Sequence, residues 1–321
     1  MSALSAVTLD DVQRAAGKLG ERIHRTPSFT SATLSSLTGP RVHLKAELFQ
    51  KTGSFKPRGV FTRLDALTPA ERAAGVIAVS AGNHAQALAY ASAREGIDCL
   101  VVMWQGASSL KLAAARGYGA AVDLETQGPG DAFERLEEIR GQRVFVHPFD
   151  DELVIAGQGT VGLEILEDVP RADVVIVPVG GGGLVAGVAV AVRALRPSAR
   201  VVAVEPEGAQ ALGSALAAGH PVPVTPLTIA DGLNAPFVGG LPLAICGELG
   251  VEHVTVSESA IEDAFRFLYQ RAKLAAEPAG AAAVAAILEG GIDISGAGEI
   301  VAVVTGGNVA GETASDILGR G

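Results

Sequence analysis

The sequence predicts an α/β protein built on parallel sheets. Short β-branched apolar segments alternate with longer Ala-rich or amphipathic segments, and this alternation is typical of parallel strands joined by helices. Several apolar segments, such as VIAVS at 76–80, VVIVPV at 174–179 and IVAVV at 300–304, show no polar alternation. Their composition indicates strands that are buried on both faces.

The same pattern places the elements along the chain. Strands are predicted near 42–47, 76–80, 99–103, 121–124, 144–147, 174–179, 201–204, 253–256 and 300–304. Helices are predicted over 83–95, 107–116, 132–140, 184–195, 261–274 and 280–288. A further helix is expected to begin at Pro57, because a proline at the first helical position lacks only an N–H that has no partner there.

We expect two domains. No Pro- or Ser-rich linker, internal repeat or low-complexity tract divides the chain, so a second lobe has to be an insertion. Residues 73–146 contain a complete βαβαβαβ pattern and are predicted to form a small inserted domain. Residues 1–72 and 147–321 then form the large domain, with ligands expected at the carboxyl ends of the strands.

Composition argues against several classes of protein. A net charge of -10 without any basic block makes nucleic acid an unlikely partner. Cys99 and Cys246 lie far apart and show no metal-type spacing, which fits buried thiols in a reducing cytoplasm. The first residues lack the basic region of a signal peptide, and the uncharged stretch 174–192 is interrupted by Pro178 and glycines, so no membrane span is expected.

Two local features predict the chemistry. Gly180, Gly181, Gly182 and Gly183 directly follow the apolar segment 174–179. Glycines there let backbone N–H groups close around a phosphate, and the following helix adds its positive end. Lys56 precedes Pro57, where a helix start disfavours the ammonium form. A partly neutral lysine can form a Schiff base, so the two features together point to pyridoxal 5′-phosphate (PLP).

A dinucleotide site is the main competing interpretation. Residues 181–186 satisfy G-x-G-x-x-A, and Glu205 ends the next predicted strand where a ribose-binding acid would lie. Taken alone, this segment favours an NAD(P)-binding oxidoreductase. It leaves the Lys56 loop unexplained.

Motifs spread over nearly the whole chain carry a resemblance to a known family. They are KAELFQKTGSFKPRG at 45–59, SAGNHAQ at 80–86, IAGQGT at 155–160, PVGGGG at 178–183, ADG at 230–232 and GGN at 306–308. In this order they resemble the threonine/serine dehydratase and serine racemase family of fold-type II PLP enzymes. The resemblance implies the tryptophan synthase β-like fold, with two parallel-type αβα sheets in a large and a small domain.

The resemblance also implies site residues. Lys56 carries the cofactor and is the catalytic residue. Phe55 packs beside the cofactor ring, Asn83 hydrogen-bonds its 3′-oxygen and Thr305 faces its pyridine nitrogen. The phosphate is bound by Gly180, Gly181, Gly182, Gly183 and Leu184, with Gly232 and Glu277 lining the pocket. The substrate carboxylate is held by Ser80, Ala81, Gly82 and His84.

The implied activity is that of an ammonia-lyase, which converts L-threonine or L-serine to a 2-oxo acid and ammonia. A homodimer is expected. Alternatives stay open: a lyase for another β-hydroxy amino acid of the 3-hydroxyaspartate or phenylserine type, a serine racemase, or a non-catalytic amino-acid-binding protein. Ala81 disfavours racemisation, because racemases of this family carry there a second serine that serves as acid and base.

A divalent cation is not expected. Some relatives bind one with a Glu, a backbone carbonyl and an Asp after the strand that matches 201–204. Glu205 and the carbonyl of Ala209 are available here, but residue 211 is alanine. The loss of one hard oxygen ligand weakens such a site considerably.

Overall fold

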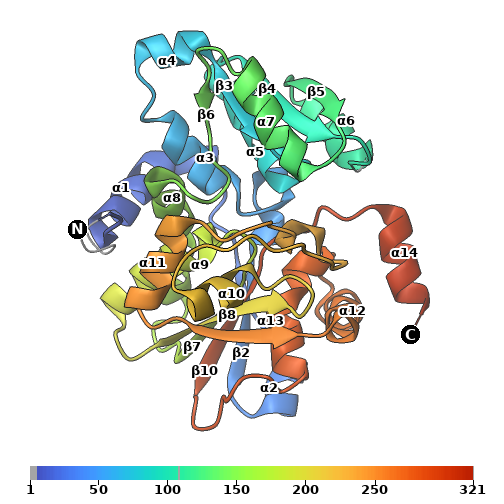
Figure 1. Ribbon diagram of the computed structural model, residues 1–321. Helices are drawn as coiled ribbons and strands as arrows, with labels where there is room; N and C mark the ends of the chain where they lie inside the picture. Colours follow the sequence, from blue (N-terminus) through green and yellow to red (C-terminus); the bar gives the residue numbers. More distant parts are fainter. Residues whose placement is uncertain (1–5, 108, 321) are drawn as a thin grey trace.

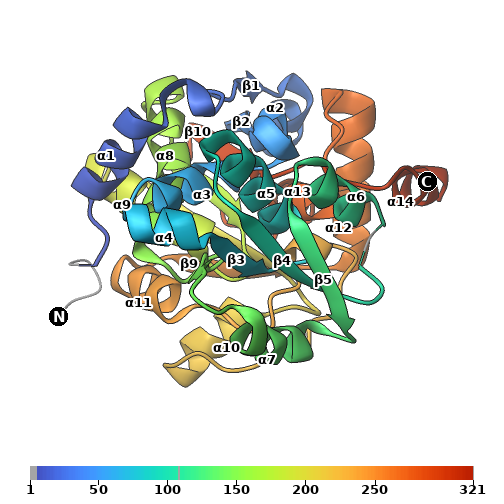
Figure 2. The ribbon, with the colours of Figure 1, turned by 90° about the horizontal axis from the view of Figure 1, so that it is seen from above.

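The computed structural model describes residues 6–107 and 109–320, and in these it contains two sheets of mostly parallel strands. The larger sheet has the strand order β1-β2-β10-β7-β8-β9 and the smaller one β5-β4-β3-β6. Figure 1 shows the smaller sheet with its helices above the larger one, and Figure 2 shows the same arrangement from above.

The larger sheet is buried on both faces at its central strands. Its strands are β1 (Ser28–Thr30), β2 (Arg41–Ala46), β7 (Val174–Pro178), β8 (Arg200–Pro206), β9 (Glu252–Val256) and β10 (Glu299–Val304). Val175 and Val177 of β7 belong to one apolar core, whereas Val174 and Ile176 belong to the other. The uninterrupted apolar runs therefore reflect burial of alternate side chains in two different cores.

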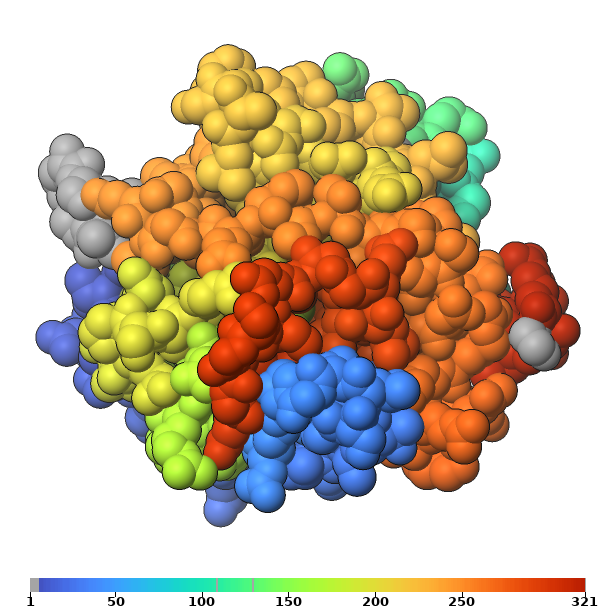
Figure 3. Space-filling model, turned by 90° about the horizontal axis from the view of Figure 1, so that it is seen from below, coloured from blue at the N-terminus to red at the C-terminus, as the bar shows by residue number. Residues whose placement is uncertain are grey.

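β10 lies at the centre of this sheet although it is the last strand of the chain. It pairs in parallel with β2 on one side and with β7 on the other. On the underside of the molecule, the blue segment near β2 lies beside the red segment that leads into β10 (Figure 3). A hydrogen bond from Arg41 N to Gly298 O, 2.8 Å long, joins the two segments there.

The smaller sheet is wholly parallel and is formed by consecutive chain. Its strands are β3 (Val76–Val79), β4 (Cys99–Trp104), β5 (Ala121–Thr126) and β6 (Val144–Phe145). These strands all lie within 73–146, and those of the larger sheet lie outside it. The domain boundaries themselves stay a prediction.

Helices connect the strands and cover the sheets. They are α1 (Leu9–Leu19), α2 (Ala32–Thr38), α3 (Pro57–Leu64), α4 (Pro69–Ala74), α5 (Asn83–Glu95), α6 (Ser109–Gly117), α7 (Pro129–Ile139), α8 (Glu152–Asp168), α9 (Gly183–Leu195), α10 (Ala211–Ala218), α11 (Gly240–Glu248), α12 (Glu258–Phe267), α13 (Pro278–Leu288) and α14 (Gly311–Gly319). Within the described residues, none of them combines the length and the apolar character that a bilayer-spanning helix needs.

The predicted strands are all present, with ends that differ by at most two residues. The helix predicted over 261–274 is wrong in its second half, since the chain changes to a π-helix at Leu268–Ala272 and stops at Lys273, whose φ is +59°. The strand β1 and several helices of the larger unit, among them α1 and α8, were not predicted. Residue 108 of the predicted helix 107–116 lies outside the described residues.

Candidate active site

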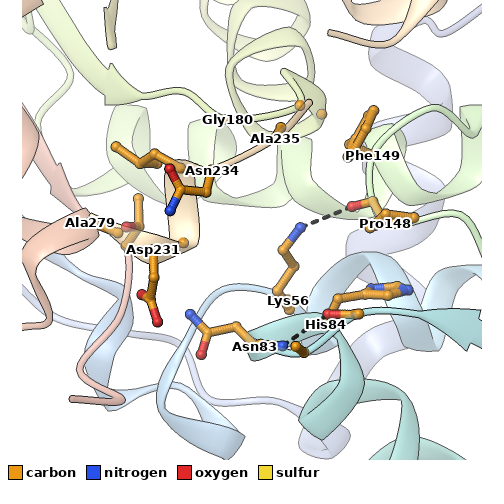
Figure 4. A pocket seen from close by; sticks show the side chains of 18 of the residues that line it. Lys56, Asn83, His84, Pro148, Phe149, Gly180, Asp231, Asn234, Ala235 and Ala279 are labelled. Carbon is orange, nitrogen blue, oxygen red and sulfur yellow. Dashed lines mark hydrogen bonds between the residues drawn. The ribbon is translucent and has the colours of Figure 1, made fainter. Parts of the chain in front are cut away.

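A cavity of about 370 Å³ lies where the carboxyl ends of strands from both sheets meet. Residues that follow β3, β7 and β10 line it. Ligands of parallel sheets bind at these carboxyl ends of the strands. Figure 4 shows Lys56, Asn83 and His84 on one side of this cavity and Gly180, Asp231 and Asn234 on the other. The structure brings together in the lining all the residues that were predicted for cofactor and substrate, namely Phe55, Lys56, Ser80, Ala81, Gly82, Asn83, His84, Gly180, Gly181, Gly182, Gly183, Leu184, Gly232, Glu277 and Thr305.

Lys56 directly precedes α3, as the position of Pro57 predicted. The preceding loop is fixed to the end of β10 by a bridge between Ser54 and Gly306 and by a hydrogen bond from Phe55 N to Thr305 O, 3.2 Å long. Lys56 Nζ donates to Pro148 O over 2.9 Å (Figure 4). Burial lowers the pKa of Lys56 to about 8, although Glu277 opposes this shift. The sequence pointed to the helix end as the cause, but burial is the main one.

A buried ionic network lies behind Lys56. The Arg58 guanidinium, which is fully buried, donates to Glu47 over 2.8 Å and to Glu164 over 2.7 Å. Burial alone would lower the pKa of Arg58, but the two carboxylates outweigh it and raise this pKa. Lys45 Nζ also donates to Glu164, over 2.7 Å. These ion pairs fix the first turn of α3. Removal of one of the charged side chains would leave its partner buried and unpaired.

The glycine loop between β7 and α9 has no room for side chains. Gly182 has a φ of +91°, in the left-handed region, and a Cβ there would lie 2.7 Å from Pro242 Cβ. A Cβ at Gly183 would lie 2.9 Å from Phe149 O. The loop leads into the first turn of α9, whose N–H groups have no partner within the helix. This arrangement suits an anion such as a phosphate.

Asn83 and Glu277 meet at the opposite side of the cavity. Asn83 Nδ2 donates to Glu277 Oε1 over 2.7 Å, and Asn308 Nδ2 donates to Asn83 Oδ1 over 2.9 Å. The second carboxylate oxygen, Glu277 Oε2, is buried and has no hydrogen-bond partner in the described part of the chain. Burial raises the pKa of Glu277 to about 7. Such an unsatisfied polar atom indicates that a bound molecule completes the site.

The loop from Ser80 to His84 leads into α5 and lines the cavity. Gly82 N donates to Ser80 Oγ over 3.1 Å. The His84 imidazole is buried, its Nε2 lies 2.9 Å from Val146 O, and burial lowers its pKa to about 3. His84 is therefore neutral at physiological pH, and the first N–H groups of α5 have no partner within the helix.

Glu205 does not reach this cavity. It is fully buried, accepts hydrogen bonds from Leu212 N (2.8 Å) and Gly213 N (2.9 Å), and lies 2.8 Å from His253 Nε2. Its oxygens hold the start of α10, so it cannot serve as the ribose-binding acid of a dinucleotide site. Ala209 contributes only backbone nearby, with its N–H donating to Pro206 O. The prediction that no divalent cation binds here stays a prediction.

The sequence analysis did not assign a role to several lining residues, among them Lys111, Asp231, Trp104 and Phe133. Lys111, nearly buried, pairs with Asp231 across the cavity from α6 to the loop before α11. Trp104 and Phe133 line another part of the wall. Nothing in the sequence indicates a binding role for a lysine in an Ala-rich helix or for isolated aromatic residues. Asp231 belongs to the ADG motif, which could have indicated that it lines the site.

The residues of the cavity fit PLP. A glycine loop without space for Cβ atoms, a lysine with a lowered pKa and a carboxylate with an unpartnered oxygen all face one cavity. The loop would hold the phosphate, Lys56 the aldehyde carbon, and Asn83 and Thr305 polar atoms of the ring.

Comparisons with known proteins agree with this site. Residues 19–306 match the model of a family described as pyridoxal-phosphate dependent enzyme. The chain is 42% identical to the catabolic L-threonine dehydratase TdcB of Escherichia coli K12, over 98% of this chain and 96% of that one. It is also 42% identical to phenylserine dehydratase of Ralstonia pickettii, over the full length of both. The structure of maize serine racemase superposes with a TM-score of 0.91 at 35% identity, over 98% of each chain.

The chain belongs to the family of pyridoxal-phosphate dependent enzymes. Its cofactor is PLP, and the fold is that of the fold-type II members, to which the structural relatives belong. The predicted family, fold class and cofactor are confirmed, and the interpretation as an NAD(P)-binding oxidoreductase is abandoned.

Proposed function

We propose that the protein is an ammonia-lyase that converts L-threonine, and also L-serine, to the corresponding 2-oxo acid and ammonia. The observation that carries this proposal is the position of Lys56. Its amine, with a pKa of about 8, lies between the glycine loop and the backbone N–H groups that start α5. The similarity to a catabolic L-threonine dehydratase over nearly the whole chain supports the same reaction.

Different residues of this chain serve different parts of the reaction. PLP, when bound, withdraws electrons from the substrate Cα and so weakens its C–H bond. The start of α5 holds the substrate carboxylate, and the glycine loop holds the cofactor phosphate. Lys56 Nζ takes up the Cα proton, because a pKa of about 8 leaves a substantial neutral fraction near neutral pH. Glu277, whose pKa is raised to about 7, accepts a hydrogen bond from Asn83 on the far side.

The overall reaction balances without an oxidant or reductant. The Cα–H and Cβ–O bonds break, and the β-hydroxyl leaves as water. The resulting unsaturated amine is hydrolysed, which takes up one water and releases ammonia. Threonine thus gives 2-oxobutyrate and ammonia in equal amounts, and serine gives pyruvate and ammonia.

The test is a product assay with the PLP-loaded enzyme and L-threonine. We expect equal amounts of 2-oxobutyrate and ammonia and little D-amino acid, since Ala81 offers no proton to the second face of Cα. If racemised amino acid is the main product, the protein is a racemase and this proposal is wrong.

The location and assembly of the enzyme belong to the same proposal. We propose a cytoplasmic enzyme, supported by two buried cysteines that form no disulfide. A homodimer is supported by apolar side chains on the surface, such as Phe29 and Phe49, which contact each other edge to face. Analytical ultracentrifugation of the holoenzyme tests the dimer, and a monomer at micromolar concentration would contradict it.

A further inference from the structure

One part of the cavity wall is aromatic and has no place in the chemistry described so far. It is formed by Trp104 at the end of β4 and Phe133 on α7. We refer to these two residues as the aryl subsite.

Trp104 and Phe133 lie on the same face of the smaller sheet. Val102 belongs to the apolar cluster between β4 and α7, and both Trp104 and Phe133 pack against this cluster. Side chains two residues apart in a strand share a face, so Trp104 continues the row of Val102 to the carboxyl end of β4. A β-bulge lies at this point, because Val102 pairs with Asp123 but Trp104 pairs with Thr126. Bulges next to active sites commonly re-aim a side chain.

The aryl subsite is next to the proposed carboxylate site. Ser80, the first residue of that loop, donates its N–H to Val102 O over 3.1 Å. Adjacent strands lie about 4.8 Å apart, so a substrate held at the Ser80 loop has its side chain within reach of the end of β4.

Phe133 and Phe149 are fixed in place by other rings. They belong to a closed series of ring contacts, with centroids 4.6 to 6.4 Å apart, formed by Phe133, Phe145, His147, Phe149 and Phe237. Trp104 differs from them. Within the described residues its indole makes neither a ring contact nor a hydrogen bond, although it lines the cavity. An indole that lines a cavity and has no ring partner is suited to bind another ring.

The charged residues of the cavity point to the same kind of ligand. Lys111 is paired with Asp231, and Glu277 lies at the same cavity. A substrate with a second carboxylate would therefore meet two carboxylates and a lysine that is already neutralised. This disfavours the 3-hydroxyaspartate type among the alternatives.

We infer that the aryl subsite binds the side chain of a β-hydroxy amino acid that carries an aromatic ring on Cβ, of which phenylserine is the simplest. The inference rests on the proposed ammonia-lyase activity and specifies its substrate. The bonds broken and formed are those given for threonine, so phenylserine yields phenylpyruvate and ammonia in equal amounts.

The first experiment measures kcat/KM of the holoenzyme for L-threo-phenylserine and for L-threonine. The variants are Trp104→Leu and Phe133→Leu, which keep an apolar side chain but remove the ring. Tyr269→Leu is the matched control, since Tyr269 is an aromatic residue outside the cavity with 50% exposure. We expect the ratio of phenylserine to threonine to fall by about tenfold or more in both subsite variants and to stay unchanged in the control. A ratio that stays constant or rises in the subsite variants overturns the inference.

The second experiment does not depend on turnover. Trp104 is the single tryptophan of the chain, so the tryptophan emission of the holoenzyme reports on the subsite itself. L-Phenylalanine, which has no β-hydroxyl to eliminate, is titrated and compared with L-alanine. We expect a saturable change in emission, half-complete at a phenylalanine concentration about tenfold or more below that of alanine. Equal midpoints overturn the subsite.

The two experiments separate failure of the subsite from failure of the proposed function. If the protein binds phenylalanine selectively at Trp104 but turns over neither hydroxy amino acid, the subsite is supported and the lyase activity is refuted. If the protein dehydrates threonine but the phenylalanine and alanine titrations have equal midpoints, the lyase activity is supported and the subsite is refuted.

Discussion

Asn83 Nδ2 lies 2.7 Å from Glu277 Oε1, and this hydrogen bond joins the first residue of α5 to the residue that precedes α13. The two residues are 194 positions apart in the chain. The bond fixes one oxygen of Glu277, whereas the other, Oε2, is buried and has no hydrogen-bond partner among the described residues. The carboxyl group is thereby held in a position where its protonation affects both folding and the chemistry of the cavity.

Replacing Glu277 by Gln should change how stability depends on pH. In the folded, cofactor-free protein the pKa of Glu277 is raised to about 7 from its ordinary 4.5. The folded state thus keeps a proton that the unfolded state releases, so the free energy of unfolding falls as pH rises from about 4.5 to about 7. This contribution is on the order of 3 kcal/mol. Urea unfolding at pH 5 and pH 8 should show a smaller difference for Glu277→Gln than for the wild type.

The control for that series is Glu312→Gln, which removes an exposed carboxylate of α14. Its pH dependence should match that of the wild type. A Glu277→Gln variant with the same slope as the wild type would contradict the role of burial at this position.

Replacing Lys56 by Ala should remove covalent attachment of the cofactor and lower turnover. Loss of a general base typically costs about 10²–10⁴ in rate. Absorption spectra before and after borohydride, together with 2-oxobutyrate assays, measure the two effects. Lys51→Ala is the matched control, because Lys51 lies in the same loop but donates to Glu21 O, outside the cavity. Wild-type colour and rate in Lys56→Ala would rule out the assignment.

Replacing Gly182 by Ala should weaken PLP binding by tenfold or more. The new Cβ would lie 2.7 Å from Pro242 Cβ, so the loop has to move away from the position that we propose holds the phosphate. Gly219→Ala has a similar φ of +76° with nothing within 4 Å, and it controls for the backbone strain of about 1–2 kcal/mol. Spectrophotometric titration with PLP gives the affinities, and equal losses in both variants would show that strain alone is responsible.

Replacing Ala81 by Ser should shift the reaction toward racemisation. Wild-type enzyme with L-serine is expected to give pyruvate and ammonia with little D-serine, because alanine cannot exchange a proton. The serine hydroxyl restores a proton donor on that side of the substrate. Chiral chromatography measures the D-serine formed per pyruvate. Substantial D-serine from the wild type would show that Ala81 does not decide the outcome.

Replacing Arg58 by Met should destabilise the protein by about 3–5 kcal/mol, since Glu47 and Glu164 would lose their buried cation. Arg14→Met is the control, because the Arg14 side chain is 64% exposed and its pair with Asp11 is at the surface. Such pairs contribute about 0–1 kcal/mol. Denaturant unfolding compares the two variants, and similar losses would contradict the structural importance of the buried network.

Much of this architecture follows from local patterns. Strands such as β7 and β10 were predictable because buried parallel strands are uniformly apolar and Gly or Pro marks their ends. Lys56 and the glycine loop were predictable because each sits at a helix start with a recognisable sequence. β1 was missed since it has only three residues and gains its partner, β2, through tertiary contacts. The second half of 261–274 was misassigned because a π-helix has the same local composition as an α-helix.

Pairings between distant residues could not be predicted from one sequence. Lys111 and Asp231 are 120 positions apart, and neither has a neighbour that indicates the other. The same holds for Trp104 and Phe133, which line one cavity only because α7 packs on β4. The cause of the lowered Lys56 pKa was also misjudged, since burial depends on how the two sheets close over the residue.

The central place of β10 governs when this protein can fold during synthesis. Strands β2 and β7 have exposed edges until the segment 299–304 pairs with both. The larger sheet is therefore complete only after residue 304 has emerged from the ribosome, whereas the smaller sheet is complete once residue 145 has emerged. A chain cut short before residue 299 leaves two apolar edges open to other chains and is prone to aggregate.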